Sequence, residues 1–113
     1  MLHQYCSQFL AYCQLADFSA RSIQALTIRL NEFKAFLKSQ RVRSVKKITY
    51  QHLINFVSDH KDPSIHVRKS RVWTLRQFFH FLTLHHSSMG LRNLIIIMLH
   101  ITTNQGFGET LNS

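Results

Sequence analysis

Glycine, proline and acidic residues are all scarce in this 113-residue sequence. The three glycines, Gly90, Gly106 and Gly108, lie near the end of the chain, which excludes a Gly-rich phosphate-binding loop in the body of the protein. The five acidic residues show no spacing typical of a paired-carboxylate site. The single proline, Pro63, marks a loop, because the residue before a proline disfavours helix. We therefore expect no catalytic and no cofactor-binding residues.

Cysteine is also rare, with only Cys6 and Cys13 in the chain. On a helix their spacing corresponds to about 10 Å, which is too long for a disulfide. We therefore expect free, buried thiols of a reducing compartment. The eight histidines and two cysteines lack the close pairing of zinc ligands, so the sequence predicts no metal site.

Long apolar runs and a secretory leader are missing as well. The polar His3 and Gln4 follow the first two residues, without a basic start or a long apolar stretch. The apolar run over residues 91–101 has about half the length needed to cross a bilayer. These features predict a cytoplasmic protein with no membrane partner.

Positive charge is what the sequence has in excess. Fourteen Lys and Arg face five Asp and Glu, which gives a net charge of +9 and a pI of about 10.3. Only Arg92 and Glu109 lie after residue 87, so the whole excess belongs to the first part of the chain. This bias favours a polyanionic partner, nucleic acid first and a membrane surface second. The alternative is a soluble basic protein whose charge has no specific partner.

Apolar side chains recur at spacings of three and four in four segments, which predicts four helices. The predicted helices cover about residues 2–16, 20–40, 49–59 and 64–86. Ser19, Thr49 and Ser64 precede the last three and are predicted N-caps. Helices of these lengths with short connectors predict an all-α domain, a compact four-helix orthogonal bundle.

The domain is expected to span residues 1–87, and residues 88–113 form a C-terminal extension. Leu94–Ile101 is a short apolar segment, for which helix is favoured over strand because no partner strand exists elsewhere. Residues 102–113 are expected to be a disordered tail. We interpret the apolar segment as an aberrant tail in preference to a segment that docks on a partner.

One pattern occurs twice in the first 87 residues. A hydroxyl-bearing helix start with nearby Arg or Lys, at Ser19 and again at Ser64, leads into an apolar, aromatic-rich stripe. A helical wheel places four side chains opposite the apolar residues of the second copy: Lys69, Trp73, Arg76 and His80. Helix-start donors and cations are the groups that bind a phosphate backbone.

Three motifs resemble the core-binding domain of tyrosine recombinases (phage integrases), also called the SAM-like N-terminal domain. Ser22–Leu37 is similar to its second helix, with Leu26 in place of the usual aromatic residue. Ile48–Phe56 is similar to its short third helix, and Leu75–Leu82 (LRQFFHFL) to its fourth-helix signature. The resemblance covers about residues 2–86 and implies the SAM-like form of the predicted four-helix bundle.

The resemblance implies double-stranded DNA as the partner, in site-specific recombination or DNA integration. In this family the second and fourth helices of the domain lie near the major groove. Carried onto the matching helices of this sequence, the DNA-binding candidates are Arg21, Ser22, Arg29, Arg68, Lys69, Arg71, Trp73 and Arg76.

The catalytic domain of the family has no counterpart here. It follows the core-binding domain and carries an Arg, a Lys, a His and a nucleophilic Tyr, whereas about 27 residues follow the fourth predicted helix. Tyr5, Tyr12 and Tyr50 lie where the family has no nucleophile. The resemblance therefore implies a truncated, frame-disrupted or excised recombinase that is not an enzyme by itself. Other protomers or a catalytic domain are its further implied partners.

Each candidate also has a structural interpretation. Arg71 lies toward the apolar side of its helix, where an ion pair competes with DNA contact. Trp73 is equally consistent with a half-buried core residue. Lys69 and Arg76 have a solvated charged face as the alternative. For the whole chain, the alternative function is a small helical protein–protein interaction module with incidental charge.

Overall fold

Helices account for nearly all of the regular structure in the computed structural model, which describes residues 2–85. Its four α-helices are α1 (Leu2–Leu15), α2 (Ala20–Ser39), α3 (Tyr50–Ile54) and α4 (Ile65–His85). A 3-10 turn, η1 (Val45–Lys47), precedes α3, and a π-helical turn, η2 (Asn55–Asp59), continues it. The described part contains no strand. The predicted all-α, four-helix fold is confirmed.

The three predicted N-caps are confirmed by their hydrogen bonds. Ser19 Oγ accepts a hydrogen bond from the backbone N–H three residues later at 3.1 Å, and Ser64 Oγ does the same at 3.3 Å. Thr49 forms a reciprocal capping box with His52: the His52 N–H donates to Thr49 Oγ1 (3.2 Å), and the Thr49 N–H donates to His52 Nδ1 (3.0 Å). Each cap satisfies donors that a helix start leaves without partners.

The turns between helices are made without glycine, since no glycine lies within residues 2–85. Asp17, Arg41, Lys61 and Asp62 take up positive φ angles of 63°, 60°, 59° and 44°. A left-handed conformation costs a non-glycine residue about 1–2 kcal/mol. The packing of the helices on either side therefore has to hold these turns in place.

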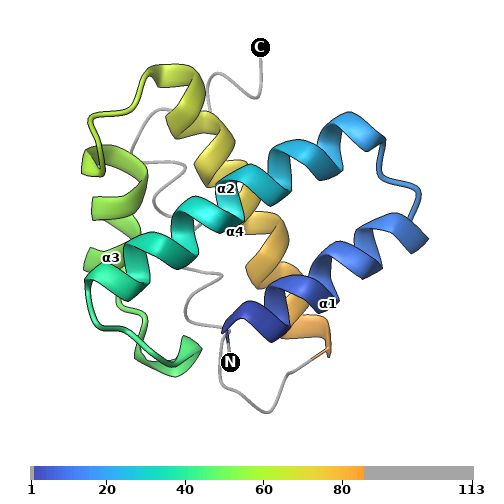
Figure 1. Ribbon diagram of the computed structural model, residues 1–113, viewed down its shortest axis with the longest axis horizontal. Coiled ribbons are helices and arrows are strands. Elements are labelled where there is room, and N and C mark those ends of the chain that lie inside the picture. Colours follow the sequence, from blue (N-terminus) through green and yellow to red (C-terminus); the bar gives the residue numbers. More distant parts are fainter. Residues whose placement is uncertain (1, 86–113) are drawn as a thin grey trace.

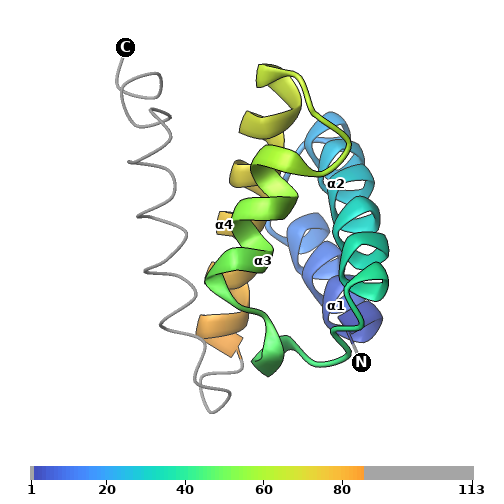
Figure 2. The same cartoon turned by 90° about the vertical axis from the view of Figure 1, so that its left-hand side faces the viewer.

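The helices form two layers. Helices α1 and α2 run side by side and antiparallel in one layer, and α4 crosses α2 in the other (Figure 1). Figure 2 shows the same arrangement from the side, with α3 and η2 beside α4. Helix α4 packs against α1, α2 and η2, which makes it the central element of the fold.

Phenylalanine is the most frequent residue type in the core between the layers. Phe33 of α2 lies 5.0 Å from Phe56 of η2 and 6.3 Å from Phe79 of α4, measured between ring centroids. Phe9 of α1 contacts Phe78 of α4 at 5.6 Å. Edge-to-face and tilted ring pairs of this kind stabilise a fold by about 0.5–1.5 kcal/mol each beyond the area that they bury.

The buried faces of α1 and α4 differ in part from the helical wheels. In α1, Cys6 is buried beside Phe9 and Cys13, whereas Tyr12 is 37% exposed. In α4, Thr74 and Phe81 are buried in addition to the apolar stripe of Val72, Leu75, Phe78, Phe79 and Leu82. Because α4 has neighbours on several sides, its buried face is wider than a stripe of apolar residues indicates.

Several predictions concern residues that the structure does not describe. The segment Leu94–Ile101, the tail 102–113 and the domain limit at residue 87 all lie outside residues 2–85. Among the described helices, none combines the length and the apolar character that crossing a bilayer requires.

Candidate nucleic-acid interface

The start of α2 presents the first group of candidates. Arg21 is exposed in the first turn, and Ser22 is half-buried behind it. The cap residue Ser19 donates a hydrogen bond from Oγ to Ser22 Oγ at 3.0 Å. The capped first turn thus holds the Arg21 cation and the serine hydroxyls together at the N-terminus of the helix, where the macrodipole favours an anion.

Arg29, about two turns further along α2, is already paired. Its Nη1 donates to both carboxylate oxygens of Glu32 at 2.8 Å, and its side chain is only 19% exposed. This ion pair offsets the positive charge that the sequence offered at this position. Arg29 therefore contributes less to the positive field of the surface than Arg21 does.

Arg71 is buried, with 3% of its surface exposed. Its Nη1 donates to the carbonyl oxygens of Phe56 and His60 at 2.9 Å each, and its Nε donates to Glu32 at 3.2 Å. The guanidinium also lies 4.6 Å from the centroid of the Phe56 ring. The predicted DNA contact of Arg71 does not fit this burial, because the guanidinium is already bound by other residues of the chain. The structure supports the ion-pair interpretation.

Four side chains share the side of α4 that is opposite its buried residues. This outer stripe consists of Lys69, Trp73, Arg76 and His80. Lys69 and Arg76 are half-buried, and neither forms a salt bridge with any residue between 2 and 85. Trp73 is half-buried and packs against the core. The stripe therefore combines two cations that have no carboxylate partner among residues 2–85 with an aromatic side chain that packs against the core.

Arg68 lies one residue before this stripe and is half-buried. Its Nε is fully buried, and within the described part of the chain it has no hydrogen-bond partner. A buried donor without a partner is costly, since folding removes its hydration and returns no hydrogen bond. The Arg68 side chain is thus partly buried against the helices, and its Nε has no acceptor among residues 2–85.

Two residues that contact Arg71 were not singled out from the sequence. Glu32 joins Arg29 and Arg71, and His60 accepts a hydrogen bond from Arg71 through its carbonyl. Burial, together with the nearby Arg71 and Lys61, lowers the pKa of the His60 ring, and Glu32 opposes this. Two features of the sequence pointed to this network: the spacing of Arg29 and Glu32 on one helix face, and the position of Arg71 toward the apolar side of its helix.

The cysteines and histidines of the described part show no arrangement typical of a metal site or of a reactive thiol. Burial raises the pKa of both Cys6 and Cys13 to about 11, so both stay protonated thiols at neutral pH. Their free, buried state was predicted and is confirmed. Across residues 2–85, no three His, Cys, Asp or Glu side chains are placed to hold a metal ion.

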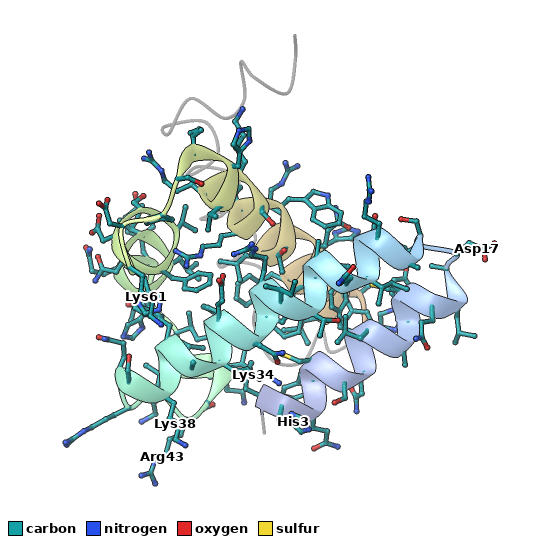
Figure 3. The ribbon with its side chains drawn as sticks, turned by 45° about the horizontal axis from the view of Figure 1, so that its top comes forward. His3, Asp17, Lys34, Lys38, Arg43 and Lys61 are labelled. Atoms are coloured by element: carbon teal, nitrogen blue, oxygen red, sulfur yellow. The ribbon has the colours of Figure 1, made fainter. Side chains whose placement is uncertain are left out.

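A second basic region lies away from the outer stripe. Figure 3 shows His3, Lys34, Lys38 and Arg43 gathered at one end of the α1–α2 layer, with Asp17 at the opposite end. The predicted DNA-binding residues do not include any of these four. Positive charge is thus concentrated in two separate places on the molecule.

Comparison with known proteins identifies a family. The family model described as phage integrase, N-terminal SAM-like domain, matches residues 6–86, which is most of the chain and nearly all of the described part. No curated protein and no solved structure matches the sequence.

Proposed function

The chain belongs to the phage integrase family through its N-terminal SAM-like domain, and on this premise we propose that residues 2–85 bind duplex DNA in site-specific recombination or integration. The proposed role is binding without strand cleavage, since the matched residues correspond to the N-terminal domain of such integrases. The two buried thiols suit a reducing, cytoplasmic setting.

The outer stripe of α4 is the observation that carries this proposal. Lys69 and Arg76 are separated by two helical turns, or about 10 Å along the axis. Because a DNA strand advances about 3.4 Å per nucleotide, this separation corresponds to roughly three nucleotide steps. Neither cation is neutralised by an acid within the described residues. The stripe is therefore suited to salt-sensitive contacts with several backbone phosphates.

The helix starts add directional donors to this charge. Arg21 beside the capped start of α2 and Arg68 in the first turns of α4 supply guanidinium groups, and the serines supply hydroxyls. Groups of this kind fix the register of a protein on a duplex without reading its sequence. We assign Arg29 a smaller part because of its ion pair, and we leave Arg71 out of the interface because it is buried.

Fluorescence anisotropy of a labelled duplex at low salt tests the proposal. We expect the double variant Lys69→Ala/Arg76→Ala to weaken binding by about tenfold or more, since each lost phosphate contact removes one charge-assisted interaction. Trp73 is the single tryptophan of the chain, so a change in its emission on binding would report contact near the stripe.

The matched control removes the same charge elsewhere. Lys46 and Lys47 are exposed residues of the 3-10 turn η1. We expect Lys46→Ala/Lys47→Ala to change the affinity by less than about threefold. Equal losses of duplex affinity in both double variants would mean that binding depends on net charge and not on the outer stripe. A wild-type protein that leaves the duplex unshifted at low salt would remove the proposal.

A second candidate function is protein–protein contact, and one observation favours it. Leu15 is 88% exposed at the end of α1 and Leu84 is 61% exposed at the end of α4. The two helix ends meet, because Tyr12 contacts both Phe81 and His85. Another recombinase protomer or a catalytic domain is the partner that we propose for this apolar end. Absence of DNA binding together with self-association that Leu15→Ser abolishes would make this candidate the leading one.

A further inference from the structure

A basic hollow lies between the start of α1 and the end of α2. Its volume is about 520 Å³, and its floor contains apolar side chains. Eight residues line it: Leu2, His3, Lys34, Leu37, Lys38, Arg41, Val42 and Arg43. Four of the eight carry a permanent positive charge, and none of the lining residues is acidic.

The end of α2 shapes this hollow. The N–H of Val42 donates to the carbonyl of Leu37 at 2.9 Å, and the N–H of Arg41 donates to that of Lys38 at 3.1 Å. With Arg41 at a φ of 60°, the chain folds back over the last turn of the helix. Residues 41–43 are thereby brought beside Lys38 instead of continuing away from it.

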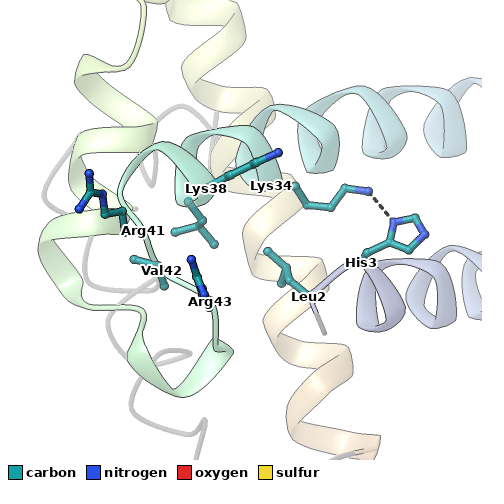
Figure 4. Close-up of a pocket in the computed structure, with 8 residues that line it drawn as sticks. Leu2, His3, Lys34, Lys38, Arg41, Val42 and Arg43 are labelled. Atoms are coloured by element: carbon teal, nitrogen blue, oxygen red, sulfur yellow. Dashed lines mark hydrogen bonds between the residues drawn. The ribbon is translucent and has the colours of Figure 1, made fainter.

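Lys34 connects this end of α2 to α1. Its Nζ lies 3.2 Å from His3 Nδ1, as the dashed line in Figure 4 shows. Because a lysine ammonium only donates hydrogen bonds, Nδ1 is the acceptor and the ring proton is on Nε2. Two N–H groups of Lys34 and the Nε2–H of His3 remain available as donors to an anion.

Among residues 2–85, no carboxylate compensates the charges around the hollow. The salt bridges of the described part all involve Glu32, so none of the lining cations is paired with a carboxylate. Lys38, Arg41 and Arg43 are exposed, and the positive charge of the lining attracts an anion into the hollow. A hollow of this volume exceeds what a single phosphate group fills.

We propose that this hollow is a phosphate-binding site that takes two or more linked phosphate groups. The shared chemistry is that of a nucleic-acid backbone and of free polyphosphate. Arg21 and Lys38 are separated by about 25 Å along α2, so the hollow is remote from the start of the helix assigned to the DNA interface. The proposal goes beyond the DNA-binding function and does not depend on the outer stripe of α4.

An NMR titration with inorganic tripolyphosphate at low salt tests the site. We expect the largest amide shifts over residues 2–3 and 34–43. The double variant Lys38→Ala/Arg43→Ala should weaken binding by about tenfold or more, because two charge-assisted donors are lost. Both side chains are exposed, so the double variant should keep the fold. If it does not, the single variant Lys38→Gln tests the same site, with a smaller expected loss of tripolyphosphate affinity.

Three comparisons decide between the outcomes. The variant Lys46→Ala/Lys47→Ala removes the same charge outside the hollow and should retain affinity within about twofold. Equal weakening in both double variants, or shifts spread evenly over all basic residues, would overturn the proposal. If a short duplex displaces tripolyphosphate, the site serves a nucleic-acid backbone; if it does not, the site serves free polyphosphate. Lys69→Ala/Arg76→Ala should leave tripolyphosphate binding unchanged, which separates this site from the DNA interface.

Discussion

Arg71 illustrates how a single buried guanidinium links three elements of the fold. Its hydrogen bonds reach η2, the loop after it and α2, through Phe56, His60 and Glu32. Replacement by methionine keeps an unbranched apolar side chain but lacks the guanidinium, so every one of these bonds is removed. We expect Arg71→Met to lower the free energy of unfolding by about 3 kcal/mol, since partners of a buried charge are left unsatisfied. Urea denaturation followed by circular dichroism measures the loss.

The control for this prediction is the same substitution on the outer stripe. Arg76 is half-buried and has no ion pair within residues 2–85, so Arg76→Met should change stability by about 0.5 kcal/mol or less. Equal effects of the two substitutions would contradict the structural role assigned to Arg71.

His60 gives the fold a pH dependence that can be assigned to one ring. The ring lies 5.1 Å from Phe36 and 6.0 Å from Phe56, between centroids, and its pKa is lowered from the ordinary value of 6.5. Because the unfolded chain binds the proton more readily than the folded one, His60 favours folding above about pH 6.5. Its contribution declines as the pH falls below that value.

The variant His60→Phe keeps an aromatic ring at this position and removes the titration. We expect its free energy of unfolding to decline less between pH 7.5 and pH 5 than that of the wild-type protein, measured by urea denaturation at each pH. All other residues are the same in both proteins, so their effects cancel in the comparison. Parallel pH profiles would show that His60 does not contribute.

At the scale of elements, the caps and the central position of α4 decide which helices form and which faces they bury. The start of α2 depends on Ser19 Oγ, which accepts a hydrogen bond from the N–H of Ser22, a donor that has no partner within the helix. We expect Ser19→Ala to cost about 1 kcal/mol of stability, whereas Ser19→Asp should stay within about 0.5 kcal/mol because a carboxylate also caps a helix. Thermal unfolding followed at 222 nm distinguishes the two. A loss of similar size in both variants would mean that the hydroxyl is not acting as a cap.

Helix α4 shows the limit of a helical wheel for an element with several neighbours. The wheel separated the outer stripe correctly from Val72, Leu75 and Phe79. It did not indicate that Phe81 is buried beside Phe9 and Tyr12, because that contact depends on where α1 lies. A wheel describes one face, whereas a central helix is covered on several.

For the whole molecule, the excess of positive charge should appear as a salt dependence. Four candidate cations, Arg21, Arg68, Lys69 and Arg76, are without a salt bridge in the described structure. If each neutralises one phosphate, the plot of log affinity against log salt has a slope of about −3.6. The affinity for a duplex should then fall by about a hundredfold between 50 and 200 mM KCl. The double variant Lys69→Ala/Arg76→Ala should make the slope shallower by about 2. A slope near zero for the wild-type protein would contradict a backbone interface.

Local signals in the sequence determined the helices of this protein. Ser19, Thr49 and Ser64 cap helices where they were predicted to, since a cap acts over three residues and needs no tertiary contact. The spacing of apolar residues likewise predicted the long stripe of α2. The family was also accessible from the sequence, because it is carried by the order and spacing of the helix motifs.

Only the tertiary structure decided which basic residues remain available to a partner. Arg71 and Arg76 are the same residue type five positions apart on one helix, yet one is buried on Phe56 and Glu32 and the other lies on the outer stripe. The basic hollow was likewise hidden from the sequence, because His3 and Lys38 lie 35 residues apart and meet only when α1 packs on α2. Burial and charge pairing are properties of neighbours in space, whereas periodicity and capping are properties of neighbours in the chain.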